Sequence, residues 1–329
     1  MNQFSSPTYL PIEINLAKNS VSIAKLEEGD YQKSIFILSK GQGKGSLHFQ
    51  DIQNLELSSF LAANAHEIKE PYFIFHHGFC CSTLISRLIE ARFQTLSLRE
   101  PPALNWATIF KKNTYPWTED NEIIFRKIID IHGRTFRSQQ RAIIKCSDYV
   151  TYCLSDFISS TTKSIFLYSD LSEYIGSCSK EKRDQWIANR ADFSTIKEYL
   201  GYQKHLDLDD TPTQATLYWC FQIAKFLENP YSENARSLNM KRIFSEKNLI
   251  KSLGNFFGLK EKYLFFRNRD QEIIKSSYSK TGDYEFSYSH RKKIIFDTLK
   301  EKQIQTEWFE GLALEILGEK LKKLESMKL

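Results

Sequence analysis

Residues 72–101 constrain the fold more than any other part of the chain. Residues 72–75 form a short apolar run, which is typical of a strand buried on both faces. Residues 76–81 make a tight, glycine-containing connection, after which Ser82 and Thr83 stand where a helix would start. The apolar face of this predicted helix consists of Leu84, Ile85, Leu88 and Ile89. A helix that begins directly after a buried strand presents unpaired N–H groups and partial positive charge, so this segment predicts a phosphate or sulfate site.

The connection lacks the lysine that nucleotide-hydrolysing loops require. The motif G-x-x-x-x-G-K-[ST] places a lysine on the terminal phosphates and a hydroxyl on the metal ion. Cys81 occupies the position before Ser82, so no such lysine is present. The sequence therefore disfavours a plain ATPase or GTPase.

Short apolar runs alternate with helical stretches after this segment. The strands that we expect lie at residues 72–75, 95–98, 142–145, 164–168 and 237–244. The helices that we expect include residues 120–138, 148–160 and 213–228. Strands separated by helix-length crossovers predict an α/β, three-layer fold: a mostly parallel sheet with helices on both faces and residues 72–75 in a central strand. Ligands bind at the carboxyl ends of such strands, which here carry His76, Arg99, Lys145 and Ser169.

Composition favours a folded protein with a large core, because 41% of the 329 residues are hydrophobic and 14% are aromatic. No run approaches the ~20 apolar residues of a membrane span, and the first residues lack the features of a signal peptide, so we expect a cytoplasmic protein. The net charge of +5 is mild and no Lys/Arg block occurs, which argues against a nucleic-acid partner. The six cysteines lack paired metal-binding spacing, so we expect reduced thiols and no metal site.

Residues 1–70 contain a possible strand at 34–38 and a glycine-rich turn at 41–45 that no helix follows directly. We expect this segment to pack on a main domain of residues 71–329. The sequence does not indicate an oligomeric state.

The loop and the strand that follows it together resemble a known protein family. HHGFCCSTLISRLIE (76–90) and then LREPPAL (98–104) resemble the sulfotransferase-type P-loop family, above all a bacterial branch with a histidine, glycine, cysteine and Ser-Thr-Leu loop. The resemblance covers residues 72–290 unevenly. It implies that the loop holds the 5′ phosphosulfate of 3′-phosphoadenosine 5′-phosphosulfate through backbone amides and Ser/Thr hydroxyls. The implied donor-binding loop residues are Gly78, Phe79, Cys80, Cys81, Ser82 and Thr83.

The loop departs from the family at Phe79, where sulfotransferases generally carry Lys or Arg. A helix terminus supplies only about half a charge, so transfer needs a cation from elsewhere. Lys145 is the best substitute, followed by Arg99 and Lys280. The alternative for each of these residues is a surface salt bridge.

Glu100 is the candidate general base, because related enzymes place a catalytic Glu or His near this position and burial can raise the pKa of a carboxyl group. The alternative is a carboxylate that pins the loop. His76 and His77 are further candidates, since both adjoin the loop and histidine titrates near neutrality. His77 could equally be a packed, hydrogen-bonded core residue.

Two later segments resemble donor-binding parts of the family. Ser177 matches the serine that binds the 3′-phosphate, whereas Ser169 replaces the partner arginine, so Arg183 or Arg190 would have to compensate. Lys280 belongs to a basic glycine loop that could close over a nucleotide; the alternative is a solvated turn.

These features predict a sulfotransferase-like enzyme that moves a sulfuryl group to a hydroxyl or amine of a small molecule. One alternative is a non-catalytic nucleotide-binding or interaction protein. A small-molecule kinase is a further alternative, which would use Asp148 or Asp170 to bind magnesium. No motif encodes the acceptor.

Overall fold

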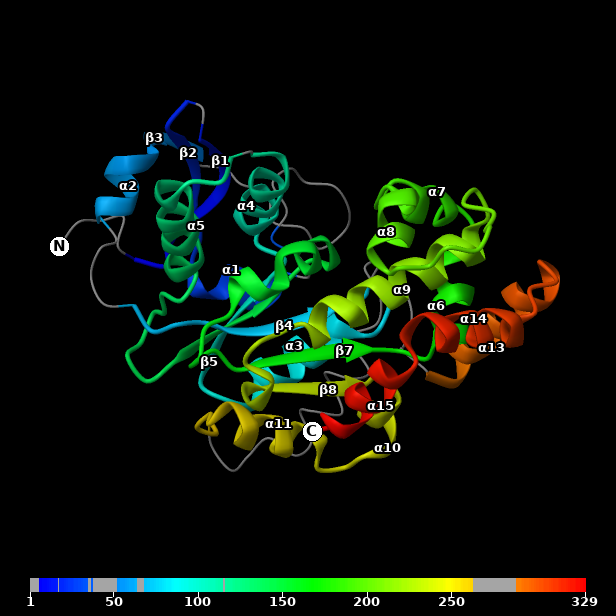
Figure 1. Cartoon of the computed structure of the whole chain (residues 1–329). Helices are drawn as coiled ribbons and strands as arrows, with labels where there is room; N and C mark the ends of the chain where they lie inside the picture. The colour runs from blue at the N-terminus through cyan, green and yellow to red at the C-terminus, as the bar shows by residue number, and fades with distance from the viewer. Residues whose placement is uncertain are drawn as a thin grey trace.

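A computed structural model describes residues 6–16, 18–34, 37, 52–63, 68–114, 116–262 and 288–329. Its main sheet contains five parallel strands in the order β5-β6-β4-β7-β8 (Figure 1). These strands are β4 (Tyr72–His76), β5 (Thr95–Arg99), β6 (Arg141–Lys145), β7 (Ser164–Tyr168) and β8 (Ala235–Asn239). The predicted parallel sheet with residues 72–75 at its centre is therefore confirmed.

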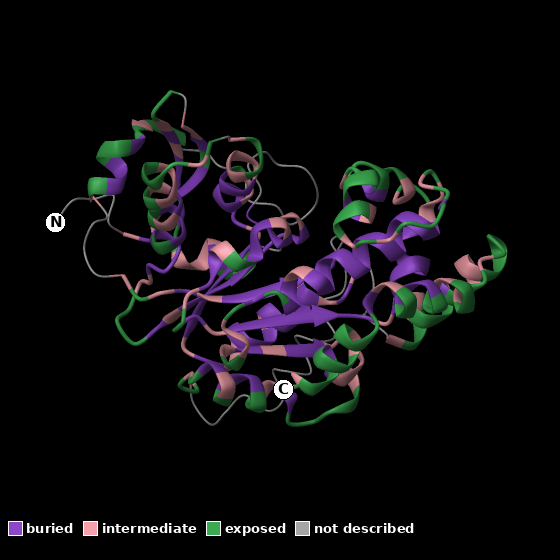
Figure 2. Ribbon diagram, in the orientation of Figure 1, coloured by how far each residue is buried: buried purple, intermediate pink, exposed green. Residues whose placement is uncertain are grey.

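The strands carry apolar residues on both faces because each face is covered by helices. In β4, Phe73 and Phe75 belong to one core, whereas Ile74 belongs to the other. The helices on the Ile74 face are α3 (Ser82–Arg92), α10 (Lys241–Ser245) and α11 (Leu249–Phe257). Those on the Phe73 face include α4 (Pro102–Asn113), α5 (Glu119–Ile131), the 3₁₀ helix η2 (Asp148–Phe157), α6 (Leu171–Cys178) and α9 (Thr211–Leu227). Figure 2 shows the buried strands between these two layers, which gives the predicted three-layer arrangement.

Further helices extend the layer around α9, which is buried along nearly its whole length. They are α7 (Asp184–Ala188), α8 (Phe193–Tyr199), the 3₁₀ helix η3 (Ser232–Asn234), α13 (Tyr288–Glu301), α14 (Thr306–Leu317) and α15 (Glu319–Ser326). α7, α8, α14 and α15 contact α9, while α13 packs on α6. Figure 1 shows α13 and α14 at the end of the molecule opposite the N-terminal sheet.

The N-terminal segment forms a small antiparallel sheet with two helices. Its elements are β1 (Tyr9–Asn15), β2 (Ser20–Lys25), β3 (Ile52–Glu56), α1 (Glu28–Lys33) and α2 (Leu57–Ala63). β1 packs on α4, and Arg134 Nη2 donates a hydrogen bond to the Tyr9 carbonyl at 2.6 Å. The buried residues of this sheet belong to the same core as Phe73.

Some predicted boundaries are wrong. The strand expected at 237–244 ends at Asn239, and Lys241–Ser245 is helical. Ser245 is the last residue of α10, and Gly258 ends α11 in the left-handed conformation. Residues 148–157 form a 3₁₀ helix in place of an α-helix.

We expected a strand at residues 34–38. Ser34 is instead the C-cap residue of α1. The glycine-rich turn at 41–45 lies outside the described residues. Within the ranges that the structure describes, no helix combines the length and apolar character needed to cross a bilayer.

Candidate functional site

The connection between β4 and α3 bends through the left-handed region of backbone space. Gly78, Phe79 and Cys81 have φ values of +77°, +48° and +61°. Left-handed residues turn successive N–H groups toward one side and create a concavity that suits an anion. α3 then begins at Ser82 with no side-chain hydrogen bond from its N-cap residue. Because its first N–H groups have no partner within the helix, the backbone here has a form that suits phosphate or sulfate.

Two histidines hold the shape of this connection. His76 Nδ1 accepts the Gly78 N–H at 2.9 Å. His77 Nε2 accepts the Ser169 N–H at 2.7 Å, so its Nδ1 carries the proton and donates to the Gly78 carbonyl at 2.9 Å. Burial lowers the pKa of His77 to about 4, which keeps the imidazole neutral. Since the backbone occupies both ring nitrogens, the structure favours the packed alternative for His77 over a catalytic role.

Of the two loop cysteines, Cys80 is buried and Cys81 is partly exposed. Burial raises the pKa of Cys80 to about 12 and that of Cys81 to about 11. The Cys80 thiol donates to the Leu167 carbonyl, with an Sγ to oxygen distance of 3.4 Å. A protonated thiol is a poor nucleophile, so neither side chain suits covalent or redox chemistry at neutral pH.

Phe79, which replaces the family's loop cation, packs between an aromatic and a cationic side chain. Its ring centroid lies 4.8 Å from that of Trp186 on α7. The guanidinium carbon of Arg183 lies 4.4 Å from the Phe79 centroid, a cation–π distance. Trp186 also covers Gly78, because a Cβ at that glycine would lie 3.5 Å from the indole. The loop is thus covered by α7 and the turn that precedes it.

Two arginines contact the loop or Ser177, and a lysine lies close enough to both arginines to feel their charges. Arg291 Nη2 donates to the Phe79 carbonyl at 2.5 Å and to Ser177 Oγ at 3.3 Å. Arg183 Nη1 donates to the Ser177 carbonyl at 3.1 Å. Burial, together with the charges of Arg183 and Arg291, lowers the pKa of Lys180 to about 8. We refer to Lys180, Arg183 and Arg291 as the cation cluster.

Sequence reasoning missed Arg291. Arg291 follows the basic glycine loop that contains Lys280, and Lys280 lies outside the described residues. The signal in the sequence is the basic triplet at 291–293, which begins soon after α13 starts. That signal could not distinguish Arg291 from its neighbours, because the contact with Phe79 spans 212 positions.

A carboxylate also lies beside the loop. Glu173 on α6 is buried and accepts a hydrogen bond from the Tyr288 hydroxyl at 2.9 Å. Burial is the main cause of the raised pKa of Cys81, and the Glu173 charge adds to it. Because Tyr288 begins α13, this hydrogen bond helps to position the helix that carries Arg291.

Glu100 and Lys145 meet at the carboxyl ends of β5 and β6. Lys145 Nζ forms an ion pair with Glu100 Oε1, and the Glu100 N–H donates to the Lys145 carbonyl at 2.7 Å. His76 Nε2 lies 4.0 Å from the same Glu100 oxygen. Lys145 also lies close enough to Cys80 to lower the pKa of that thiol, an effect smaller than that of burial. Three residues selected from the sequence therefore lie together beside the loop, and their catalytic roles stay a prediction.

Lys145 forms an ion pair with Glu100, whereas Arg291 contacts the loop itself. Arg291 is therefore the stronger candidate for the missing loop cation. Arg99 does not serve as that cation, and this expectation is wrong. Its guanidinium is fully buried, pairs with Glu90 of α3, and donates to the carbonyls of Tyr31 at 2.8 Å and Ser34 at 2.7 Å. Arg99 instead joins the N-terminal segment to the main sheet.

The carboxylates proposed for a kinase each have a cationic partner. Asp148 lies 3.2 Å from Arg190 Nη2 and accepts the Tyr218 hydroxyl at 3.3 Å. Asp170 forms an ion pair with Lys241. Among the described residues, no group of three His, Cys, Asp or Glu side chains could hold a metal ion. Of the two arginines proposed to compensate for Ser169, Arg190 is paired with Asp148, whereas Arg183 contacts the Ser177 carbonyl.

Comparisons with known proteins give little further information. No family model matches the sequence, and no curated protein matches it. Among solved structures, a sulfotransferase domain from the curacin biosynthetic pathway aligns with 73% of this chain and 99% of that chain. The sequence identity is 9% and the TM-score is 0.40. The topology of the chain itself defines a three-layer α/β fold, with a five-stranded parallel sheet flanked by helices.

Proposed function

We propose that this protein is a sulfotransferase-like enzyme. It binds a phosphosulfate nucleotide at the β4–α3 loop and transfers the sulfuryl group to a hydroxyl or amine of a small molecule. The observation that carries this proposal is the cation cluster beside a loop that already has the backbone form of an anion site. Sulfuryl transfer, like phosphoryl transfer, passes through a loose transition state. The protein stabilises such a state mainly with positive charge and oriented hydrogen-bond donors.

The donor, 3′-phosphoadenosine 5′-phosphosulfate, carries two separate anionic groups. The loop amides and the hydroxyls of Ser82 and Thr83 receive the 5′ phosphosulfate. Ser177 and the cation cluster receive the 3′-phosphate. Burial and mutual repulsion act against the charge of Lys180, and a bound phosphate relieves both effects. Arg291 touches the loop and Ser177 at once, so it links the two parts of the donor site.

The transfer step moves one group and one proton. The bond between sulfur and the 5′-phosphate oxygen breaks, and a bond forms between sulfur and the acceptor oxygen or nitrogen. The acceptor proton passes to the Glu100 carboxylate, while adenosine 3′,5′-bisphosphate leaves. Lys145 and the backbone bond to its carbonyl hold Glu100 in place, and positive charge from Arg291 stabilises the leaving phosphate.

Donor binding is tested with adenosine 3′,5′-bisphosphate by isothermal titration calorimetry. Arg291→Ala should raise Kd about 10–100-fold, because it removes a charge-assisted hydrogen bond worth about 1.5–3 kcal/mol. Lys293→Ala is the matched control, since it removes an exposed charge from the same helix. Equal affinity of Arg291→Ala and wild type would overturn the proposed donor site.

Catalysis is tested by release of the bisphosphate from the donor with panels of phenols, alcohols and amines. Glu100→Gln should lower turnover about 10²–10⁴-fold and leave Kd for the bisphosphate nearly unchanged, because the base acts on the acceptor. If the protein binds the bisphosphate but forms none from the donor with any acceptor panel, the non-catalytic alternative is favoured. Stabilisation by ATP only when magnesium is present favours the small-molecule kinase.

A further inference from the structure

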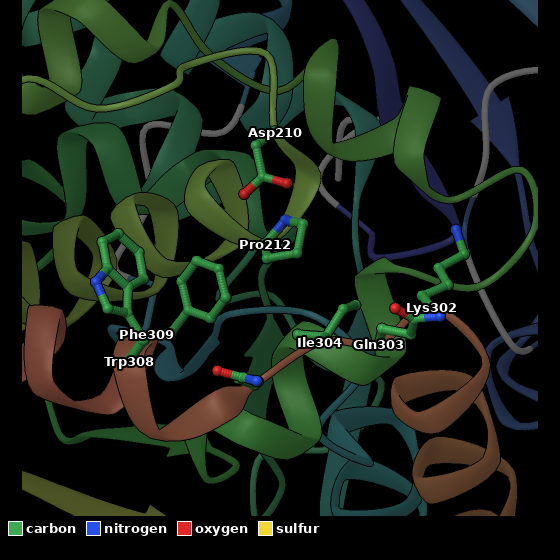
Figure 3. A pocket seen from close by; sticks show the side chains of 8 residues that line it. Asp210, Pro212, Lys302, Gln303, Ile304, Trp308 and Phe309 are labelled. Atoms are coloured by element: carbon green, nitrogen blue, oxygen red, sulfur yellow. The ribbon is translucent and has the colours of Figure 1, made fainter.

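A pocket of about 360 Å³ lies between the start of α9 and the junction of α13 with α14 (Figure 3). Its walls come from Asp210 and Pro212, the connection at residues 302–305, and Trp308 with Phe309. The β4–α3 loop contributes no residue to it.

The start of α9, which lines the pocket, lies away from the carboxyl end of β7. Trp219 Nε1 donates to the Ser169 carbonyl at the end of β7, at 3.1 Å. Asp210 precedes Trp219 by nine positions, which corresponds to about 13 Å along the helix axis. The pocket therefore does not form part of the candidate donor site.

We infer that this pocket binds a zwitterionic small molecule of the amino-acid class, with its ammonium group at Asp210, its carboxylate at Lys302 and its apolar part against Trp308. The inference is independent of the proposed function. It rests on the carboxylate, the aromatic wall and the lysine that line one cavity.

Asp210 uses one of its two oxygens to cap α9. Its Oδ2 accepts both the N–H of Thr213 at 2.9 Å and the hydroxyl of the same residue at 2.7 Å. These bonds fix the carboxylate, and Oδ1 takes no part in them. A ligand ammonium at Oδ1 would meet a carboxylate that is already oriented.

The aromatic wall is largely open to solvent. Trp308 is 54% exposed, and its ring meets that of Phe309 edge to face with 4.7 Å between centroids. Figure 3 shows both rings projecting from α14 on the same side of the pocket. The apolar or aromatic part of the ligand covers this surface.

Lys302 supplies the opposite charge. Figure 3 shows it on the other side of the pocket from Trp308. The backbone around it is held by hydrogen bonds from Lys302 N to the Thr298 carbonyl at 3.1 Å and from Ile304 N to the Leu299 carbonyl at 2.9 Å. A ligand with only one charge would leave Asp210 or Lys302 unmatched, whereas a zwitterion pairs with both. The volume is at the small end of ligand pockets, which fits an amino acid.

Three probes with one phenyl skeleton test this inference by titration calorimetry: L-phenylalanine, phenethylamine and 3-phenylpropionate. Phenylalanine should bind the full chain at least ~10-fold more tightly than either singly charged probe, as expected when a second charge pair adds about 1.4 kcal/mol. Asp210→Asn should abolish this preference over phenylpropionate while preserving the helix cap, since Asn is an equally good N-cap residue. Lys302→Gln should abolish the preference over phenethylamine.

Glu310→Gln is the control, because it changes an exposed charge on α14 outside the pocket walls. Trp308→Ala should weaken all three probes together. Equal affinities for the three probes, no binding of phenylalanine in the millimolar range, or unchanged selectivity in both Asp210→Asn and Lys302→Gln would each overturn the inference.

Discussion

Arg291 shows how a single residue can restore a charge that the loop itself lacks. Phe79 occupies the loop position at which sulfotransferases generally carry a cation, and the guanidinium of Arg291 donates to the carbonyl of that same residue. Ser177 accepts a second hydrogen bond from Arg291. The positive charge thus comes from a helix near the end of the described chain, and the aromatic side chain of Phe79 packs against α7.

The pH dependence of donor binding should follow Lys180. Its pKa falls from the usual 10.5 to about 8 because of burial and the neighbouring Arg183 and Arg291. A bound phosphate favours the protonated amine, so affinity for adenosine 3′,5′-bisphosphate should be highest below pH 8 and should fall as pH rises through that value. The effect on folding stability has the opposite sign. Between pH 8 and 10.5 the Lys180 amine keeps its proton in the unfolded chain but loses it in the folded chain. The contribution of Lys180 to the free energy of unfolding therefore rises with pH in this range.

Calorimetric Kd values across this pH range check the expectation. Lys180→Met should flatten the profile, whereas Lys182→Met, which alters an exposed neighbour, should retain it. A profile that is unchanged in Lys180→Met would exclude Lys180 as the group responsible.

At the scale of elements, one buried ion pair joins β5, α3 and the N-terminal segment. Arg99 at the end of β5 pairs with Glu90 of α3, and the same guanidinium donates to the carbonyls of Tyr31 and Ser34. Glu90 Oε1 also accepts the Ser97 N–H at 3.2 Å. Because α3 carries the candidate anion site at its first turn, this pair anchors the helix behind that site.

Glu90→Gln should lower the free energy of unfolding by about 3–5 kcal/mol, because it leaves the Arg99 charge buried without a counter-charge. Urea unfolding measures this loss. Glu319→Gln is the matched control: it breaks an exposed pair with Lys322 and should change stability by less than about 1 kcal/mol. Similar losses in the two variants would show that the buried pair contributes no more than a surface pair.

At the scale of the whole molecule, the N-terminal sheet and the main domain share a core. Buried residues of β1 and β2, such as Leu10 and Ile23, belong to the same cluster as Phe73 of β4 and Leu104 of α4. Arg134, which is buried, adds a hydrogen bond from the main domain to Tyr9. A shared core makes independent unfolding of the small sheet costly, because its separation would expose apolar surface on both sides.

We therefore predict that the described parts of the chain unfold as one cooperative unit. Native-state hydrogen exchange should give the same opening free energy for the amides of β2, the middle strand of the small sheet, and β4, the middle strand of the main sheet. Markedly faster exchange in β2 would identify the N-terminal sheet as a separate unit.

The amino-acid sequence by itself determined the unit from residue 72 to residue 92 and the parallel class of the main sheet. These depend on local signals: an apolar run, a tight turn and a helix with one apolar face. Sequence position also put Glu100 and Lys145 at the carboxyl ends of parallel strands, which share one edge of the sheet, and the two side chains form an ion pair there. Local signals were weaker at residues 237–244, where a short apolar run suits strand or helix equally and the chain forms both.

Only the tertiary structure decided which charged residues stand at the loop. Arg99 and Arg291 look alike in the sequence, yet Arg99 forms a buried ion pair with Glu90 and Arg291 contacts the β4–α3 loop. His77 likewise adjoins the loop in the sequence, but packing gives both of its ring nitrogens to the backbone. A side chain's partners depend on contacts between distant segments, and periodicity and capping patterns carry no information about those contacts.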